Sequence, residues 1–166
     1  MNFQFSEEQQ LFADQVRRFA ERHLAADALQ RAHQVGFPYD VAQLMADQGL
    51  LGISFSEKDG GQGGSLIDSV IAIEQVALVC PRSADVIQAG NFGPIRTFVE
   101  YATPQQKERY LGDLLAGREV MSLCMSEPGA GSAVTELTTT AKADGKGFIL
   151  NGTKVFSTHS SDASLY

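Results

Sequence analysis

The hydrophobic pattern of this chain changes period near Gly117, and this change limits the folds that the chain can adopt. Before this glycine, apolar residues recur at steps of three and four, as they do in helices that bury one face. After it, short apolar or threonine-rich runs alternate with glycine turns, which is typical of antiparallel strands. The sequence therefore predicts an α+β protein in segregated order, with a helical bundle over 1–117 and the first antiparallel strands of a β domain over 118–166.

Capping residues indicate where the helices begin. Ser6 and Gln9 have the spacing of a capping box, and Thr103-Pro104 places a cap directly before a proline at the first helical position. A glycine-rich stretch over 54–65 has no apolar period and predicts an exposed loop. The helix after this loop is apolar on nearly every side, so we expect it to be buried. Helices are predicted over 6–26, 38–51, 65–80, 83–89, 92–101 and 103–116.

Four short runs after Gly117 read as strands, at 120–125, 138–143, 148–150 and 153–158. Asp144-Gly145 and Asn151-Gly152 separate the later runs, and both pairs favour tight hairpin turns. This spacing predicts a meander of antiparallel strands. Because Tyr166 still lies on a strand-like segment with no element to cover the sheet, we expect the chain to be a fragment of a longer protein.

Charge and cysteine content exclude some classes of function. Aspartate and glutamate number 20 against 13 lysines and arginines, for a net charge of -7, and no basic run is present to bind nucleic acid. Cys80 and Cys124 lie far apart in apolar surroundings, as reduced core cysteines do. The apolar run over 70–79 is too short for a membrane span, and no secretory signal is evident, so a cytoplasmic protein is expected. The three histidines lack partners at metal-ligand spacing, so no metal site is expected.

Two segments carry the chemistry. Residues 121–132 form an apolar strand that breaks into a turn rich in glycine and hydroxyl groups, and 151–158 contain an aromatic followed two residues later by a hydroxyl. A planar ligand with a polar rim needs backbone N–H groups, hydroxyls and a flat packing surface. We therefore expect the ends that bear Ser126 and Thr158 to converge on such a ligand.

Together these segments resemble the flavin-binding segments of the acyl-CoA dehydrogenase family. Phe5-Ser6-Glu7-Glu8-Gln9, the glycine-rich loop at 59–64, Thr103-Pro104-Gln105-Gln106-Lys107 and Asn151-Gly152-Thr153-Lys154 also occur in family order. The resemblance implies an N-terminal helical domain and the beginning of a middle β-barrel domain, with the family's C-terminal helical domain absent.

The resemblance also implies residue roles. It implies that Ser132 contacts the acyl-CoA as well as the cofactor. The catalytic glutamate of relatives lies in the C-terminal domain, so no catalytic residue is expected here and the base is expected beyond Tyr166. Neither Glu127, part of a structural turn, nor the solvated Glu136 is assigned that role. The implied FAD-binding residues are Leu123, Met125, Ser126, Gly131, Ser132, Phe156 and Thr158.

Some positions differ from the common family pattern. Leu123 stands where tyrosine or phenylalanine is frequent, and Ala133 where aspartate is usual, while Ser126 and Phe156 replace threonine and tryptophan with similar chemistry. The run 159–161 replaces Asn-Gly-Gly. Flavin affinity and acyl-chain preference are therefore expected to differ from those of better-known members.

The implied activity is α,β-dehydrogenation of an acyl-CoA thioester, with electrons passed to an electron-transfer flavoprotein. A homo-oligomer, dimer or tetramer, or a heteromer with a related subunit is expected. Two alternatives stay open. One is a non-catalytic partner subunit of a heteromeric dehydrogenase, and the other is a flavin monooxygenase-like member of the superfamily.

Overall fold

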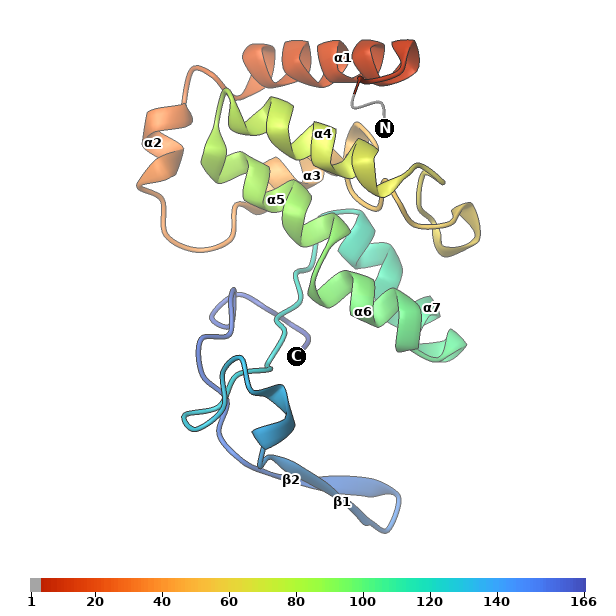
Figure 1. Cartoon of the computed structure of the whole chain (residues 1–166), viewed down its shortest axis with the longest axis vertical. Helices are drawn as coiled ribbons and strands as arrows, with labels where there is room; N and C mark the ends of the chain where they lie inside the picture. The colour runs from red at the N-terminus through yellow and green to blue at the C-terminus, as the bar shows by residue number, and fades with distance from the viewer. Residues whose placement is uncertain (1–3) are drawn as a thin grey trace.

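The protein, described here by a computed structural model over residues 4–166, has a helical body followed by a C-terminal part, residues 118–166, that is mostly loop with one hairpin (Figure 1). This order confirms the prediction of a helical domain followed by antiparallel strands. The strands are β1 (Thr140–Asp144) and β2 (Gly147–Asn151). The helices are α1 (Glu7–His23), α2 (Ala28–Ala32), α3 (Tyr39–Asp47), α4 (Leu66–Ala77), α5 (Pro81–Asn91), α6 (Pro94–Tyr101) and α7 (Pro104–Leu115), with 3-10 turns η1 (Glu57–Asp59) and η2 (Val134–Glu136).

Local sequence signals set several helix starts. The side-chain oxygens of Ser6, Ser65 and Thr103 each accept a hydrogen bond from the backbone N–H three residues on, and that residue's side chain accepts one from the backbone N–H of the cap. These reciprocal bonds satisfy donors that the first helical turn leaves unpaired. The predicted capping box of α1 and the predicted cap of α7 are therefore confirmed, and α4 also begins with a capping box.

Other helix boundaries differ from the prediction. The helix predicted over 65–80 stops at Ala77, and the helix predicted over 83–89 begins earlier, at Pro81. A proline suits this first turn because its missing N–H has no intrahelical partner there. Pro38 precedes α3 as its cap. The short helix α2 was not predicted, because its five residues include no buried side chain and so show no apolar period.

The main core lies between α1, α3, α4 and α5, and a second cluster joins α6 and α7. Phe55, from the loop before η1, packs in the second cluster, and Met121 and Leu165 pack against it. Both ends of the C-terminal part are therefore attached to the helical body. The buried side chains of the main core include Val16, Ala20, Val41, Met45, Ala72, Val76, Val86 and Ile87.

Helix α4 is not buried on all sides, contrary to the prediction. Leu66, Ile67 and Val70 keep about half of their surface exposed, at 49%, 48% and 51%. The helix packs against α1 and α5, and these two neighbours leave a third side open. Composition alone predicted burial, but the number of packing partners decided it.

The side chain of Asn91 is fully buried and joins three parts of the helical body. Its Oδ1 accepts the Ile53 N–H at 2.6 Å, and its Nδ2 donates to the carbonyls of Leu50 and Ile87 at 2.9 and 2.8 Å. The Ser69 hydroxyl of α4 lies 3.5 Å from the same Oδ1. A buried amide is stable only with such partners, so Asn91 fixes the Leu50–Ile53 segment against the end of α5.

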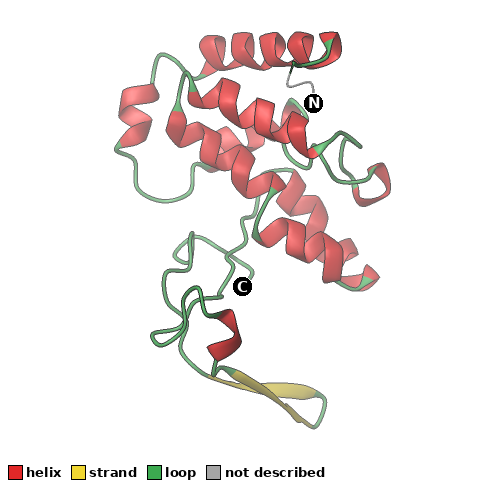
Figure 2. Cartoon of the chain, in the orientation of Figure 1, coloured by secondary structure: helices red, strands yellow, loops and turns green. Residues whose placement is uncertain are grey.

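The strands after Gly117 are fewer than predicted. Only β1 and β2 form a ladder, with Thr140 opposite Asn151 and Asp144 opposite Gly147 (Figure 2). The Asp144-Gly145 turn is confirmed, and Gly145 has the positive φ of 60° that such a turn requires. The prediction of a tight hairpin turn at Asn151-Gly152 is wrong. Asn151 is the last paired residue of β2, and no strand follows it, up to Tyr166, to complete a hairpin. The runs 120–125 and 153–158 do not form strands of a sheet, and Met121 makes only an isolated bridge with Leu165.

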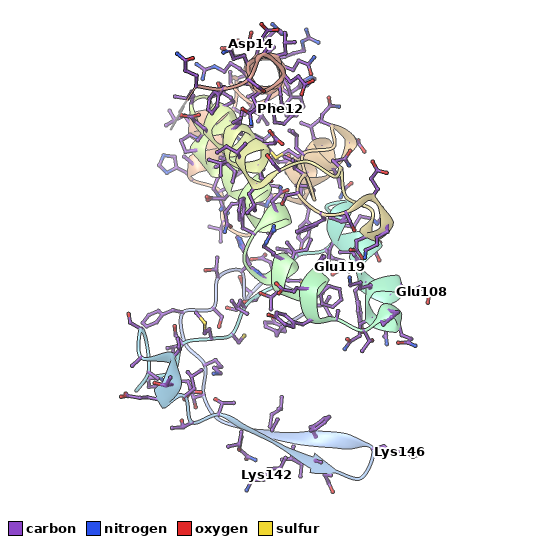
Figure 3. All side chains as sticks on the ribbon, turned by 45° about the vertical axis from the view of Figure 1, so that its right-hand side comes forward. Phe12, Asp14, Glu108, Glu119, Lys142 and Lys146 are labelled. Carbon is purple, nitrogen blue, oxygen red and sulfur yellow. The ribbon has the colours of Figure 1, made fainter. Side chains whose placement is uncertain are left out.

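The β1–β2 hairpin extends away from the helices, while the C-terminus returns toward them (Figure 1). Every residue of both strands is exposed, and side chains such as those of Lys142 and Lys146 project into solvent (Figure 3). Phe148 and Leu150 of β2 are each 73% exposed. Across residues 4–166, no helix has the length and apolarity needed to cross a membrane.

Replacing Asn91 with alanine is expected to destabilise the protein by roughly 2–4 kcal/mol, because it leaves the Ile53 N–H and the Leu50 carbonyl buried and unpaired. Chemical denaturation of both proteins measures this difference. The exposed Gln34 provides the control, since Gln34→Ala should change the free energy of unfolding by less than about 0.5 kcal/mol. Equal stability of Asn91→Ala and wild type would contradict the assigned role.

A pair of glycine substitutions tests the junction between the two parts. Gly117 has a φ of 67°, and a Cβ there would lie 2.6 Å from the Ala42 carbonyl oxygen. Gly117→Ala is therefore expected to cost roughly 2–4 kcal/mol. Gly112 lies inside α7 with open space around it, so Gly112→Ala should stabilise by about 0.5–1 kcal/mol. Thermal unfolding of both variants should show shifts of opposite sign.

Candidate functional site

Two segments about thirty residues apart lie side by side in the C-terminal part. The Val155 N–H donates to the Ser126 carbonyl at 2.9 Å, and the Ser122 hydroxyl donates to the Thr158 carbonyl at 2.7 Å. The Ser122 N–H also donates to the carbonyl of Leu165 at 2.9 Å. These bonds bring the segments around Ser126 and Thr158 together, although neither segment belongs to a regular sheet.

A buried carboxylate locks this arrangement. The Glu127 side chain is only 3% exposed and accepts hydrogen bonds from the Thr138 N–H and hydroxyl, both at 2.7 Å, and from the Thr139 N–H at 2.9 Å. The Lys154 ammonium donates to the same carboxylate at 2.8 Å and to the Met125 carbonyl at 3.0 Å. Glu127 thus links the turn after Ser126 to the start of β1 and to the segment that carries Thr158.

The electrostatics of this lock follow from its bonds. The hydrogen bond from Lys154, followed by those from Thr139 and Thr138, holds the pKa of Glu127 far below its ordinary value. A carboxylate that accepts several such bonds stays ionised and has no free lone pair directed toward a ligand. Glu127 is therefore a structural anion and not a general base, as the sequence predicted.

Ser126 and Thr158 both line a cleft of about 250 Å³ between the two segments and the helical body. Leu123, Met125 and Phe156 line it as well. Five of the seven residues predicted to bind cofactor therefore share one cleft. The remaining lining residues are Gln88, Ala89, Pro94, Met121 and His159.

The chemistry of this cleft suits an uncharged ligand with a polar edge. No aspartate, glutamate, lysine or arginine is among its lining residues in the part of the chain that the structure describes. Met121, Leu123 and Met125 supply apolar contacts, while the hydroxyls of Ser126 and Thr158 supply hydrogen-bonding groups. This is the combination that an isoalloxazine ring requires, so the lining residues fit a flavin.

The backbone around Thr158 has an uncommon conformation. Phe156 and His159 have φ values of 57° and 61°, and they are the non-glycine residues with positive φ among residues 4–166. This region costs a residue with a side chain about 1–2 kcal/mol. Phe156 is also 93% exposed, so its aromatic face is free at the edge of the cleft. Strained positions of this kind cluster at ligand sites in proteins.

Gly131 and Ser132 lie outside the cleft. Both are exposed, in the bend that follows the turn from Glu127 to Ala130, and no atom lies within 4 Å of where a Gly131 Cβ would be. Their predicted contacts with cofactor and acyl-CoA therefore stay predictions. Glu136, in η2, is likewise exposed and does not line the cleft.

The sequence did not point to the helical wall of the cleft. Gln88 and Ala89 come from α5 and Pro94 from the start of α6, and none of them belongs to a motif. Their only sequence signal was membership of helices, which says nothing about which side faces the C-terminal part. His159 was recognisable as a possible ligand contact only because it follows Thr158 directly.

A larger hollow of about 850 Å³ lies elsewhere, between α3, α7 and the glycine-rich loop. Lys107 of α7 pairs with Asp59 of this loop at 2.9 Å, and Gly61 packs against Phe55. The loop is thus fixed to the helical body, and the hollow shares no lining residue with the cleft. Charged residues of both signs line this hollow, whereas, within residues 4–166, the lining of the cleft holds no acidic or basic residue except His159.

Comparison with known proteins gives consistent results. Residues 6–118 match the model for the acyl-CoA dehydrogenase N-terminal domain, and residues 122–166 match that for the middle domain. A short-chain specific acyl-CoA dehydrogenase of Clostridium acetobutylicum is 30% identical over 166 residues, which cover 100% of this chain and 44% of the relative. The chain therefore spans less than half the length of this relative.

Solved structures show the same fold. A chain from a structure described as the electron transferring flavoprotein of Acidaminococcus fermentans is 30% identical, with a TM-score of 0.84, and the match covers 98% of this chain and 43% of that one. A chain from an FAD complex of PigA is 25% identical with the same TM-score of 0.84, covering 95% and 42%. The arrangement of the helices and the C-terminal part is thus shared with these proteins.

Glu127→Gln is expected to lower the melting temperature at pH 7, because it removes the charge that pairs with Lys154. The lowered pKa of Glu127 means that the folded state stays unprotonated where the unfolded state already binds a proton. The stabilisation is therefore complete above the ordinary value of 4.5 and is lost as the pH falls toward the lowered pKa. Thermal unfolding at pH 7 and pH 3 should show the difference from wild type shrinking in acid.

The matched control for this experiment is Glu136→Gln, which removes an exposed carboxylate nearby. This variant should melt like the wild type at both pH values, since an exposed charge contributes little. If Glu127→Gln melts like wild type at pH 7, the carboxylate does not hold the two segments together.

Proposed function

The chain belongs to the acyl-CoA dehydrogenase family, and from this premise we propose that it forms the flavin-binding part of an FAD-dependent acyl-CoA dehydrogenase. The proposed reaction is α,β-dehydrogenation of an acyl-CoA thioester, and the proposed electron acceptor is an electron-transfer flavoprotein. The observation that supports this most directly is the shared cleft of Ser126 and Thr158, which has neutral walls and an exposed aromatic at its edge.

Each wall of the cleft has a role in this proposal. The hydroxyls of Ser126 and Thr158 hydrogen-bond to the polar edge of the ring, and Leu123 and Met125 contact its apolar part. Phe156 packs beside the ring with the face that is exposed in this structure. When bound, the flavin supplies the capacity to accept a hydride. The protein residues position it and exclude water, and the absence of charge in the lining keeps the surroundings neutral.

The turn after the cleft is proposed to bind the remainder of the ligands. Gly131 and Ser132 lie in an exposed bend with open space around the glycine, so their backbone N–H groups and the Ser132 hydroxyl are accessible. We assign Gly131 and Ser132 to the cofactor, and Ser132 also to the acyl-CoA. Open backbone donors next to glycine are suited to phosphate oxygens and carbonyls.

The carboxylate base of the proposed reaction is not among the residues described here. Glu127 is occupied by four hydrogen bonds, and Glu136 lies away from the cleft. A base must reach the substrate proton directly or through one water molecule. We therefore assign this role to a glutamate elsewhere in the full-length protein, as the family resemblance implies.

Domain limits, assembly and location complete the proposal. We assign residues 1–117 to the helical domain, of which 1–3 lie outside the described residues, and 118–166 to the middle domain. We propose a cytoplasmic protein that assembles as a homo-oligomer or with a related subunit. The solved relative associated with an electron transferring flavoprotein supports the choice of acceptor. The solved relative in an FAD complex supports the choice of cofactor.

Two spectroscopic observations on the full-length protein test the proposal. It should purify with, or bind, FAD, and the visible flavin absorbance should bleach when an acyl-CoA is added without oxygen. Bound FAD without bleaching by any acyl-CoA would contradict the dehydrogenase reaction, and oxygen uptake with substrate would indicate a monooxygenase. Absence of FAD binding would instead identify a non-catalytic subunit.

Ser126→Ala and Thr158→Val should each weaken FAD binding by about 3- to 10-fold, because each removes one hydrogen bond while keeping the side-chain shape. Fluorescence titration of the flavin measures the dissociation constants. Ser160→Ala is the matched control, since this hydroxyl is exposed in the same turn and does not line the cleft. Unchanged affinity in both cleft variants would remove these hydroxyls from the flavin site.

A further inference from the structure

The residue that follows Thr158 connects the cleft to the helical body. The His159 ring packs edge-on against the Phe37 ring, with centroids 5.1 Å apart and planes at 76°. Phe37 lies before α3 and packs against the main core of the helical body. His159 also lines the cleft itself. The imidazole of His159 therefore packs against the Phe37 ring of the helical body and also lines the cleft proposed to bind flavin.

The turn that contains His159 is held by several bonds. The His159 carbonyl accepts from the N–H groups of Asp162 and Ala163 at 3.0 and 2.8 Å, and the Ser160 N–H donates to the Ser157 carbonyl at 3.2 Å. The Tyr39 hydroxyl of α3 donates to the Asp162 carbonyl at 2.9 Å. The turn is thus fixed to the segment around Phe37 and Tyr39 at two points, by the ring contact and by this bond.

This attachment explains why the strained backbone persists. Phe156 and His159 bracket Ser157 and Thr158, and both have positive φ. Such conformations persist where the surrounding contacts determine them, and they cluster at ligand sites. Histidine is among the residues that accept this region more readily. The strain is therefore placed at the residues that orient the Thr158 hydroxyl and the exposed Phe156 ring.

The charged neighbours of His159 come from two elements. Arg82 and Asp85 lie on α5, where Arg82 also donates to the Gly36 carbonyl at 2.6 Å, and Asp162 lies in the same turn as the histidine. Burial lowers the pKa of His159, and Arg82 lowers it further, while Asp162 and Asp85 act in the opposite direction. Tyr39 also faces this turn. The imidazole is accordingly neutral near pH 7, which keeps the cleft free of charge.

We propose that His159 is a positioning residue of the flavin cleft, whose ring contact with Phe37 holds Thr158 and Phe156 in the orientation that receives the flavin. This inference rests on the proposed function. It also means that the helical body controls the shape of the cofactor site through a contact between rings.

The test measures FAD binding in His159→Asn and Phe37→Leu. Asparagine tolerates the same backbone conformation but lacks the ring, so the substitution removes the contact and keeps the turn. Each variant should weaken FAD binding by about tenfold, and the double variant should be little weaker than either single one, because both remove the same contact. His33→Asn, at an exposed histidine, is the matched control and should bind like wild type.

Two further readouts separate positioning from a general loss of stability. Phe37→Tyr keeps a ring against His159 and should bind FAD more tightly than Phe37→Leu. In the wild type, FAD binding should weaken as the pH falls below the ordinary histidine pKa of about 6.5, because protonation places a charge in the otherwise uncharged lining of the cleft. His159→Asn should lack this dependence. Thermal unfolding then shows whether the variants remain folded under the binding conditions.

The outcomes distinguish this inference from the proposed function. If the wild type binds FAD and His159→Asn binds it equally well, His159 is not a positioning residue, while the flavin site itself stands. Additive effects of His159→Asn and Phe37→Leu would also overturn the coupling. If the wild-type protein binds no FAD, both proposals fail together.

Discussion

The C-terminal part depends on the buried carboxylate of Glu127. This part contains one short hairpin and otherwise lacks the ladder of backbone bonds that would fix an extended chain. Glu127 supplies an alternative, because it pairs with Lys154 and satisfies the N–H groups of Thr138 and Thr139. A single ionised group thereby holds together three segments that are separate in sequence. Together with the bonds from Val155 to Ser126 and from Ser122 to Thr158, this lock joins the two segments that carry the hydroxyls of the cleft.

The helical body provides the second half of the site. Asn91 fixes the Leu50–Ile53 segment to α5, and the same helix presents Gln88 and Ala89 to the cleft. Met121 and Leu165, near the two ends of the C-terminal part, pack on the cluster formed by α6 and α7. The cleft is therefore a boundary between two kinds of structure. The helices provide one wall, and the two loop segments provide the hydroxyls and the exposed aromatic.

The errors of prediction have a common cause. The runs at 120–125 and 153–158 have the apolar and β-branched residues of strands, but a strand exists only where a neighbour completes its hydrogen bonds. Asn151-Gly152 has the composition of a tight turn, but no hairpin forms there. Asn151 already pairs with Thr140 at the end of β2, and the residues after Gly152 have no neighbouring strand to pair with among residues 4–166. The exposure of Val70 on α4 shows the same dependence, since burial needs a packing partner as well as an apolar side chain.

The sequence by itself determined the order of helical and extended parts, the capped helix starts at Ser6 and Thr103 and the identity of the hydroxyls at Ser126 and Thr158. These follow from local chemistry, because caps, turns and side-chain types act within a few residues. Only the tertiary structure decided that α5 and α6 form a wall of the cleft and that Glu127 pairs with Lys154. The positive φ of Phe156 and His159 was likewise decided there. These features arise from contacts between residues far apart in the chain, which no local period encodes.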